Sequence, residues 1–476
     1  MHQASRYRPC PRITALGDGF YDEVAPARFP RHILRFRNQR AAAQVGLGDL
    51  GHEAWTAHLG RFEPLADNLG TPLALRYHGH QFDVYNPHLG DGRGFVFAQV
   101  LDGADRLLDL GTKGSGTTPW SRGGDGRLTL KGGVREVLAT EMLEALGVPT
   151  SRSLSLHETG ERLMRGDEPS PTRSSVLVRL SHSHLRFGTF QRLAHARDVE
   201  RLERLVRYVA AQYFPDLGPG LGGAALAAAL LSRVSRATAA LCARLMVAGF
   251  VHGVLNSDNM SITGECFDYG PYRFLPSYDL SFVAAYFDHQ GLYAYGQQPR
   301  AMLCNVLRLG EALRPLAPDL ALLPLASDFE ATLGRESARH LVWRLGLQPE
   351  PDLDAALLAR AVSFLRESAV GYEQLFFDAY GGAGQAPALR AGPKAPYAGP
   401  AWAQLRELLA LYRPASTDLP PYFEGEGPCT LLIDEIEAIW TAIAERDDWS
   451  PFDAKIERIR EAGAALARAA PAPASP

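Results

Sequence analysis

The most informative stretch of this chain is HGVLNSDNMSITGECFDYGP, residues 252–271. Within it, Asp258 and Asn259 are neighbours, and Asp268 follows nine residues after Asn259, in the triplet DYG. An amide oxygen and a carboxylate on nearby loops are hard ligands, which suit a Mg²⁺ ion that also binds phosphate groups. Taken singly, NSDN is also typical of a capping turn and DYG of a strand end. Their order along the chain favours a metal–nucleotide site.

The order of these motifs is that of kinase-like phosphotransferases. In those enzymes a His opens the catalytic loop, an Asn closes it, and an Asp-aromatic-Gly triplet follows. The third residue of the loop is there the Asp that meets the incoming hydroxyl. Here that position holds Val254, which cannot accept a proton. The loop therefore indicates either a chain without kinase activity or an enzyme whose base lies elsewhere.

A lysine and a glutamate upstream extend this pattern. FVFAQVL (95–101) and RLLDLGTKG (106–114) predict two strands around a turn, and the second brings Lys113 to its end. GGVREVLATEMLEALGVPT (132–150) has apolar residues at helical spacing and carries Glu136. A strand Lys oriented by a helix Glu is the kinase arrangement for holding phosphates. Taken alone, the two residues are better explained as surface charges, because lysines and glutamates are common, but the DYG loop favours the pair.

Two glycine-rich loops in the same region carry arginine. They are LGDGRG (89–94) and SRGGDGR (121–127), and neither matches a P-loop or a full GxGxxG motif. Glycine lets backbone N–H groups approach phosphate oxygens, although each loop alone is also an ordinary turn. The candidate residues are Gly90, Gly92, Arg93, Asp125 and Gly126.

Arginines also interrupt the apolar segment VLVRLSHSHLRFGTF, residues 176–190. Arg179 lies inside a predicted strand and Arg186 follows it. A buried guanidinium must pair with an anion, because burying it alone is costly. The partner is either a bound nucleotide or a structural carboxylate. His182 and His184 have no third ligand in register, so we expect no metal there.

These segments predict an α+β chain with a kinase-like bilobal fold. We expect an N-terminal arm over 1–70, a small β-rich N-lobe over 71–185, and a larger, mainly helical C-lobe over 186–476 that ends in a helical extension. RSLSLHETGERLM and SSVLVRLS predict two further strands of the N-lobe, and RNQRAAAQVGL and HEAWTAHLG predict helices in the arm. The helices expected in the C-lobe cover 198–214, 224–248, 298–314, 327–346, 352–375, 401–412, 430–446 and 452–469.

Composition narrows the class of protein. The 476 residues are 46% hydrophobic and 21% charged, with a formal net charge of −4, which is ordinary for a globular protein and argues against a nucleic-acid binder. The most apolar stretch contains Arg233, Arg236 and Arg244, so a buried helix is favoured over a membrane span. The five cysteines form no CxxC pair and no secretory pattern begins the sequence, so we expect a cytoplasmic protein.

Five stretches, taken in order, resemble the selenoprotein O family. They are GHQFDVYNPHLGDGR (79–93), LDLGTKGSGTTPWSRGGDGRLTLKGGVREVL (108–138), VLVRLSHSHLRFGTF (176–190), HGVLNSDNMSITGECFDYGP (252–271) and YDLSFVAAYFDHQGLYAYGQQP (278–299). The resemblance implies a kinase-like fold that binds ATP flipped relative to kinases. It also implies transfer of AMP from ATP to Ser, Thr or Tyr hydroxyls of proteins, with release of pyrophosphate.

The resemblance assigns roles to residues of this chain. Asp258 is expected to be the base, Asn259 and Asp268 the ligands of Mg²⁺ or Mn²⁺, and Lys113 with Glu136 the phosphate-holding pair. The remaining expected nucleotide contacts are Gly90, Gly92, Arg93, Asp125, Gly126, Arg179 and Arg186, together with Asp268. The expected partners are ATP and protein substrates, without nucleic acid or membrane. The segment FVAAYFD (282–288) departs from the family by lacking an Asn-His pair.

Two other functions compete with AMP transfer. A kinase-like phosphotransferase would release ADP, and Val254 argues against it. An ATP-binding pseudokinase would bind the nucleotide without turnover, and the intact Asn259–Asp268 pair argues against that.

Overall fold

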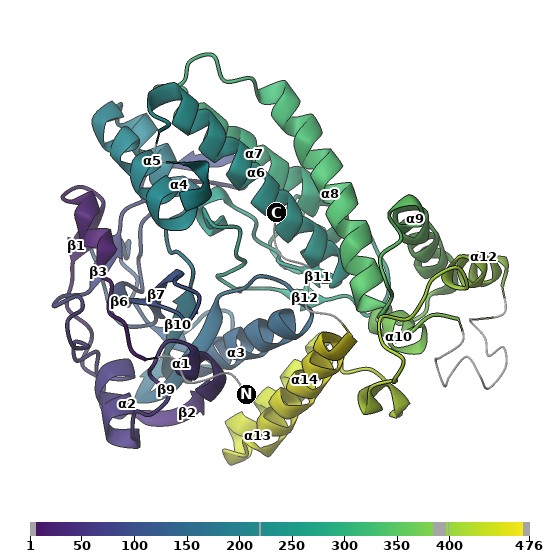
Figure 1. The fold of residues 1–476 in the computed structure, drawn as a ribbon. Helices are drawn as coiled ribbons and strands as arrows, with labels where there is room; N and C mark the ends of the chain where they lie inside the picture. The colour runs from purple at the N-terminus through teal and green to yellow at the C-terminus, as the bar shows by residue number, and fades with distance from the viewer. Residues whose placement is uncertain (1–5, 219, 384–396, 398, 470–476) are drawn as a thin grey trace.

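An antiparallel sheet forms the first half of the protein. The computed structural model describes residues 6–218, 220–383, 397 and 399–469. Its strands pair in the order β1-β3-β6-β7-β10-β9-β2, with β8 also on β10 (Figure 1). Their bounds are β1 Tyr21–Glu23, β2 Ile33–Arg37, β3 Leu73–Leu75, β6 Val96–Leu101, β7 Leu107–Lys113, β8 Leu128–Thr129, β9 Arg152–Leu163 and β10 Thr172–Ser181. The mixed α and β class expected from the sequence is confirmed.

Side chains alternate between the two faces of this sheet. In β10, Leu177 joins the core that contains α3 (Leu130–Ala145), whereas Val176 and Val178 join the core that contains α1 (Gln39–Gln44) and α2 (His52–Leu59). This split follows from the period of two along a strand. The sheet is thus buried on both faces, and its central strands are rigid supports for what they carry.

The predicted strands β6, β7, β9 and β10 and the predicted helices α1, α2 and α3 are all present. The first 70 residues hold more than the expected helices, because β1 and β2 pair with β3 and β9 in the main sheet. Short strands also pair outside it, β4 (Gly79–Gln81) with β5 (Val84–Asn86) and β11 (Phe250–Val251) with β12 (Arg273–Phe274).

Helices dominate after residue 185, as predicted, and those from α4 to α8 lie above the sheet in Figure 1. The predicted helix over 352–375 is wrong in one respect: Ala369 adopts a left-handed conformation with φ of 52°, which divides it into two helices. The bounds are α4 Phe187–His195, α5 Val199–Tyr213, α6 Gly223–Val247, α7 Gln298–Leu313, α8 Leu322–Arg344, α9 Pro351–Ser368, α10 Tyr372–Asp378, α12 Pro400–Leu409, α13 Ile433–Arg446 and α14 Ser450–Ala469.

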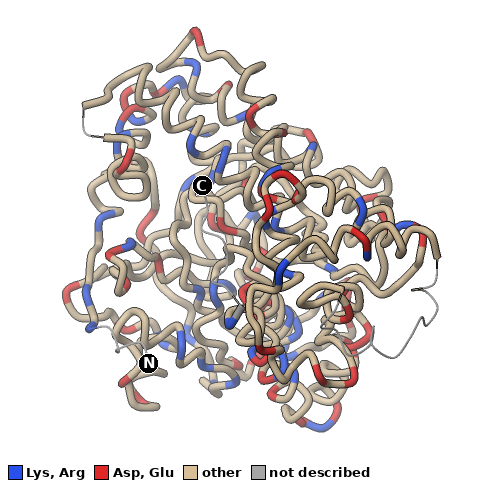
Figure 2. Tube along the Cα trace, turned by 45° about the vertical axis from the view of Figure 1, so that its right-hand side comes forward, with Lys and Arg blue, Asp and Glu red and all other residues tan. Residues whose placement is uncertain are grey.

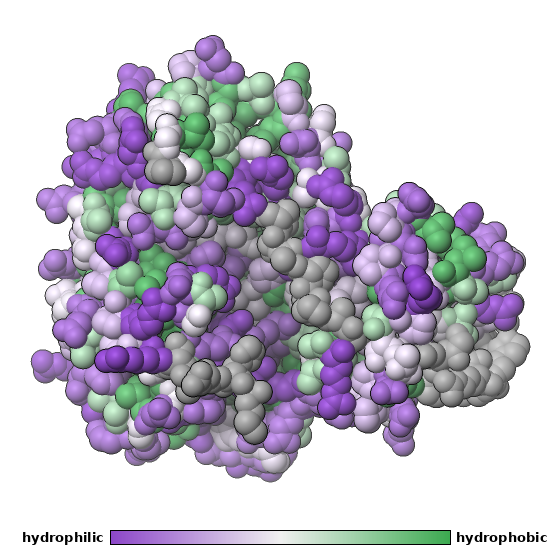
Figure 3. Space-filling model, viewed as in Figure 1, coloured by the Kyte–Doolittle hydropathy of each residue, from purple (hydrophilic) through white to green (hydrophobic). Residues whose placement is uncertain are grey.

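α6 is the central helix of this half. By length and composition it is the one helix of the described residues that could cross a membrane, but 67% of its most apolar window is buried inside the protein. It packs against α7 and α8, which is the arrangement of a core helix. The surface in Figure 3 is largely hydrophilic, with apolar residues scattered between. Basic and acidic residues are mixed along the trace in Figure 2.

The last two helices, α13 and α14, pack beside the sheet against α3. α14 packs along α3, and its Phe452 and Ile459 are buried in the same core as α3. Arg460 donates to Glu141 of α3 at 2.7 and 3.0 Å, and Lys131 lies 2.7 Å from Glu437 of α13. The C-terminal extension therefore supports the helix that carries Glu136.

Candidate active site

A cavity of about 690 Å³ lies where the sheet meets the loops of the helical half, and we call it the main cavity. Its lining within the described residues includes seven Lys and Arg against four Asp, so it is suited to a polyanion. Of the residues expected from the sequence, it gathers Gly90, Gly92, Arg93, Lys113, Asp125, Gly126, Arg179, Arg186, Asp258, Asn259 and Asp268. Glu136 lies behind Lys113.

Asp268 is the centre of the charged cluster. Arg179 Nη1 lies 2.5 Å from its Oδ1, Arg186 Nη1 lies 2.9 Å from its Oδ2, and Lys113 Nζ lies 3.4 Å from its Oδ1. Burial alone would raise the pKa of this carboxyl, but the charges of Arg179, Lys113 and Arg186 outweigh it and hold the pKa well below its usual range. Asp268 is therefore ionised, as a metal ligand must be.

The expected Lys113–Glu136 pair forms an ion pair between β7 and α3. Both side chains are buried, and burial lowers the pKa of Lys113 although Glu136 partly opposes this. Because α3 is packed between the sheet and α14, the carboxylate fixes the ammonium beside the cavity. The same ammonium lies 3.4 Å from Asp268 Oδ1.

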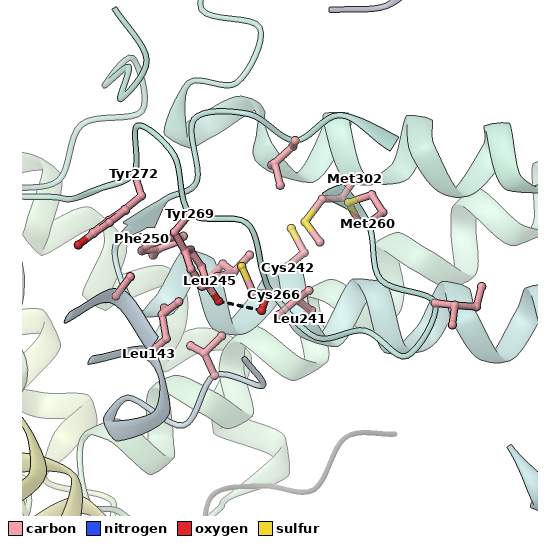
Figure 4. Close-up of a cluster of buried hydrophobic side chains, with 14 of the residues drawn as sticks. Leu143, Leu241, Cys242, Leu245, Phe250, Met260, Cys266, Tyr269, Tyr272 and Met302 are labelled. Atoms are coloured by element: carbon pink, nitrogen blue, oxygen red, sulfur yellow. Dashed lines mark hydrogen bonds between the residues drawn. The ribbon is translucent and has the colours of Figure 1, made fainter. Parts of the chain in front are cut away.

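The loop that presents Asp268 is anchored by its neighbours. Figure 4 shows Tyr269 and Cys266 packed with Leu241 and Leu245 of α6, and the Tyr269 hydroxyl donates to the Cys266 carbonyl at 2.8 Å. His252 Nε2 donates to the Phe267 carbonyl at 3.1 Å. Asp268 itself adopts φ of 64°. This left-handed residue lies between two buried aromatic residues and faces the cavity.

Asp258 lies in a short 3₁₀ turn, Ser257–Asn259. Gln81 Nε2 lies 3.4 Å from its Oδ2, whereas Oδ1 is buried without a hydrogen-bond partner in the described structure. Burial raises the pKa of Asp258 to about 6, and the charge of Arg186 limits the rise. A carboxylate with a pKa near neutrality and an unused oxygen is suited to accept a proton.

Asn259 is oriented by its own loop. Its Nδ2 donates to the Val254 carbonyl at 2.9 Å, so the amide oxygen is the atom left for a cation. No group of three His, Cys, Asp or Glu able to hold a metal occurs in the described parts of the chain. The oxygens of Asn259 and Asp268 fit a divalent ion that takes its other ligands from phosphates and water.

The glycine-rich loops are shaped by close packing. A Cβ on Gly90 would overlap the ring of Trp120, and one on Gly126, whose φ is 67°, would overlap the backbone of Gly116. Asp125 is held by Arg165 at 2.8 Å and by the backbone N–H of Arg127 at 3.0 Å. At Gly90 and Gly126 there is no room for a side chain, so the backbone itself forms the cavity wall there.

Sequence reasoning missed two residues that organise the site. Asp91 is buried, lies 3.2 Å from Arg186 Nη2 and accepts the Leu75 N–H at 3.0 Å. Gln81 contacts Asp258. Both lie in GHQFDVYNPHLGDGR (79–93), but a single Asp or Gln has no spacing pattern that would mark it as functional.

Comparison with known proteins places the chain among nucleotidyltransferases. A family model described as "Protein adenylyltransferase SelO" matches residues 4–385. A Synechocystis sp. relative named "Protein nucleotidyltransferase YdiU" is 42% identical over 94% of this chain and 97% of its own length. A Gloeobacter violaceus relative of the same name is 46% identical, over 95% and 94%. One from Trichormus variabilis is 47% identical, over 77% and 75%.

Proposed function

The chain belongs to the protein adenylyltransferase SelO family, and we propose that it transfers AMP from ATP to Ser, Thr or Tyr hydroxyls of proteins. The family makes the chain a protein nucleotidyltransferase that uses ATP. The acceptor hydroxyl, the divalent ion and the role of each residue are the proposed parts.

One observation carries the proposal. Asp258 lines the same cavity as the Asp268 cluster and keeps a buried Oδ1 without a partner in the described structure. Its pKa, raised by burial to about 6, leaves it ionised at neutral pH yet basic enough to take a proton. Val254, at the position of the kinase base, lines the cavity, but its side chain has no atom that could accept a proton.

In the proposed reaction Asp258 accepts the proton of a protein hydroxyl. The hydroxyl oxygen then forms a bond to the α-phosphorus of ATP while the bond from that phosphorus to the bridging oxygen of pyrophosphate breaks. Arg179, Arg186 and Lys113 neutralise charge that develops on the departing pyrophosphate. A Mg²⁺ or Mn²⁺ ion held by Asn259 and Asp268 would add to this neutralisation.

We also infer that the protein has a kinase-like bilobal architecture, with 71–185 as N-lobe, 186–476 as C-lobe and 1–70 as an arm that adds β1 and β2 to the sheet of the N-lobe. The sheet with its Lys113–Glu136 pair precedes the helices, and the main cavity is lined from both halves. That arrangement supports the inference, together with the order of the motifs.

Two labelled ATPs test the function. The full chain is incubated with a generic protein acceptor, Mg²⁺ and ATP labelled at either the α- or the γ-phosphate. We expect label only from the α-phosphate, a mass gain of one AMP and loss of both in Asp258→Ala, whereas Asp319→Ala, an exposed aspartate, retains them. Label only from the γ-phosphate would make the protein a kinase. Bound ATP without any transfer would make it a pseudokinase.

A further inference from the structure

A second cavity lies away from the main cavity, and we call it the arginine cavity. Its volume is about 620 Å³, and among the described residues it shares no lining residue with the main cavity. Its walls come from the start of β7 and of β9, the loop after α3, the end of α5, the face of α6 and the loop 263–265. The residues of its walls that bear charge are Arg106, Arg152, Arg233, Arg244, Glu144 and Glu265.

Arginines from separate elements converge on this cavity. Arg233 and Arg244 lie eleven residues apart on α6, which places them on one face of the helix, three turns and about 16 Å apart. Arg106 precedes β7 and Arg152 begins β9. A guanidinium binds phosphate oxygens with two parallel hydrogen bonds, so this set suits a ligand with more than one anionic group.

Arg106 is held by the nearly buried Asp102 at 2.7 Å, whereas the partners of Arg152 and Arg233 are weak competitors for a ligand. Arg152 lies 3.1 Å from Glu144, with both side chains 27% exposed, and Arg233 lies 3.6 Å from Asp216, which is 61% exposed. Ion pairs that are open to water contribute little, so a ligand anion can replace these carboxylates at small cost.

The inner wall is buried and positively charged. The Arg244 side chain is buried, and burial lowers its pKa to about 10, which still leaves it charged. The charge of Glu336 raises the pKa of Arg244, so this cation is partly compensated. Burial raises the pKa of Glu265 to about 7 and so leaves this carboxyl partly neutral at neutral pH, and the lining of the cavity carries four arginines against two glutamates.

The cavity also has an apolar side. Tyr213 and Phe214, at the end of α5, line it together with Leu180 of β10. The Tyr213 hydroxyl is buried and makes no hydrogen bond within the described structure. A ring beside arginines fits a molecule that carries an apolar or aromatic group next to its phosphates.

We propose that the arginine cavity binds a small phosphorylated molecule, separately from the ATP in the main cavity. Arg106, Arg152, Arg233 and Arg244 hold its phosphates, and Tyr213 and Phe214 contact its apolar part.

The arginine cavity adjoins the loop that carries Asp268. Glu265 lies three residues before Asp268. Cys266 N donates to the Pro149 carbonyl at 2.9 Å, and Ser151 N donates to the Cys266 carbonyl at 2.9 Å. These bonds join the wall of the arginine cavity to the back of the Asp268 loop. A bound ligand is therefore expected to change the rate of nucleotide transfer.

Equilibrium dialysis of the full chain with labelled AMP and labelled pyrophosphate tests this site. We expect two sites per chain for at least one of the probes. Arg93→Glu should remove the site in the main cavity and leave the other. Arg233→Glu should weaken that remaining site about tenfold or more, and Arg233→Lys, which keeps the charge but loses the paired hydrogen bonds, should weaken it less than Arg233→Glu does.

Arg236→Glu is the matched control, because Arg236 is an exposed residue of the same helix outside the cavity. Thermal melting of each variant shows whether it is folded. A single site per chain for both probes, lost in Arg93→Glu, would overturn the proposal. So would a second site that Arg233→Glu and Arg236→Glu weaken equally. Neither result bears on AMP transfer, which the labelled ATPs measure.

Discussion

Arg186 donates through Nη1 to the backbone oxygen of Asp258 at 2.9 Å. The same nitrogen lies 2.9 Å from Asp268 Oδ2, and Nη2 lies 3.2 Å from Asp91. The guanidinium also lies over the Phe267 ring, 4.8 Å from its centre. One side chain thus connects the loop of the proposed base, the loop of the proposed metal ligand and a glycine-rich loop.

Arg186→Lys is expected to lower kcat for AMP transfer by about 10²–10³-fold, because a lysine cannot keep these bonds together and loses charge stabilisation of the departing group. Initial rates of AMP incorporation at saturating ATP measure this. Arg236→Lys, on the exposed side of α6, should retain the parent rate. A rate above half of the parent value in Arg186→Lys would show that its links to Asp258 and Asp268 are dispensable.

Asp258 should give the rate a distinct pH dependence. Only the ionised carboxylate accepts a proton, and burial raises its pKa to about 6. The rate should therefore fall about tenfold for each pH unit below that pKa and level off above it. A pH–rate profile between pH 4.5 and 8 measures this. Asp258→Asn should be slow at every pH, and its rate should not fall further below pH 6. If the fall below pH 6 remains in this variant, another group is responsible for it.

The ionised Asp258 side chain should also lower the unfolding free energy of the protein. Its pKa in the folded protein lies above the unfolded value of 3.8, so the folded state binds the proton more tightly and stability falls as pH rises from about 4 to about 6. The amide introduced by Asp258→Asn does not titrate, so the unfolding free energy of this variant relative to that of the parent protein should rise by about 2–3 kcal/mol from pH 4 to pH 8. Urea unfolding at both pH values measures the gain, and Asp319→Asn should show none.

Lys113 and Glu136 should behave as one unit. Lys113→Ala and Glu136→Ala are each expected to lower kcat/KM for ATP, and the double variant should be little worse than the worse single one, because each change breaks the same buried pair. A double-mutant cycle on kcat/KM measures the coupling. The partly exposed pair Lys131–Glu437 is the control, and its removal should change stability by less than about 1 kcal/mol. Strictly additive effects at Lys113 and Glu136 would contradict the pairing.

Gly90→Ala is expected to weaken ATP binding and to lower the unfolding free energy by about 1–3 kcal/mol, because the added methyl group overlaps the Trp120 ring. Titration with ATP measures the binding, and urea unfolding followed by tryptophan fluorescence measures the unfolding free energy. Gly103→Ala is the matched control, since a Cβ at Gly103 meets nothing within 4 Å. Equal effects of the two substitutions would exclude the Trp120 contact as the cause.

Patterned segments of this chain could be predicted from the sequence. β6, β7, β9, β10 and α3 have apolar residues at the spacing of their structure, which places Lys113 at a strand end and Glu136 on a helix. The carboxylate and amide of the DYG and NSDN motifs also come together in one cavity, as their order indicates.

What the sequence did not predict depends on distant contacts. β1 and β2 are only three and five residues long. They are strands because they pair with the main sheet, β1 at one edge and β2 at the other. The break at Ala369 involves a left-handed alanine, which no composition signals. The ion pair of Arg186 with Asp91 joins residues 95 positions apart in the chain.

The helix α14 lies beyond residue 385, where the match to the family model ends, yet it covers the apolar side of α3 with Phe452 and Ile459. A chain cut after residue 385 would expose the face of α3 that packs on α14, while the face on β9 and β10 stays covered, and it would remove the support behind Glu136. We therefore expect a fragment that keeps the family's motifs but lacks the C-terminal helices to be a poor catalyst.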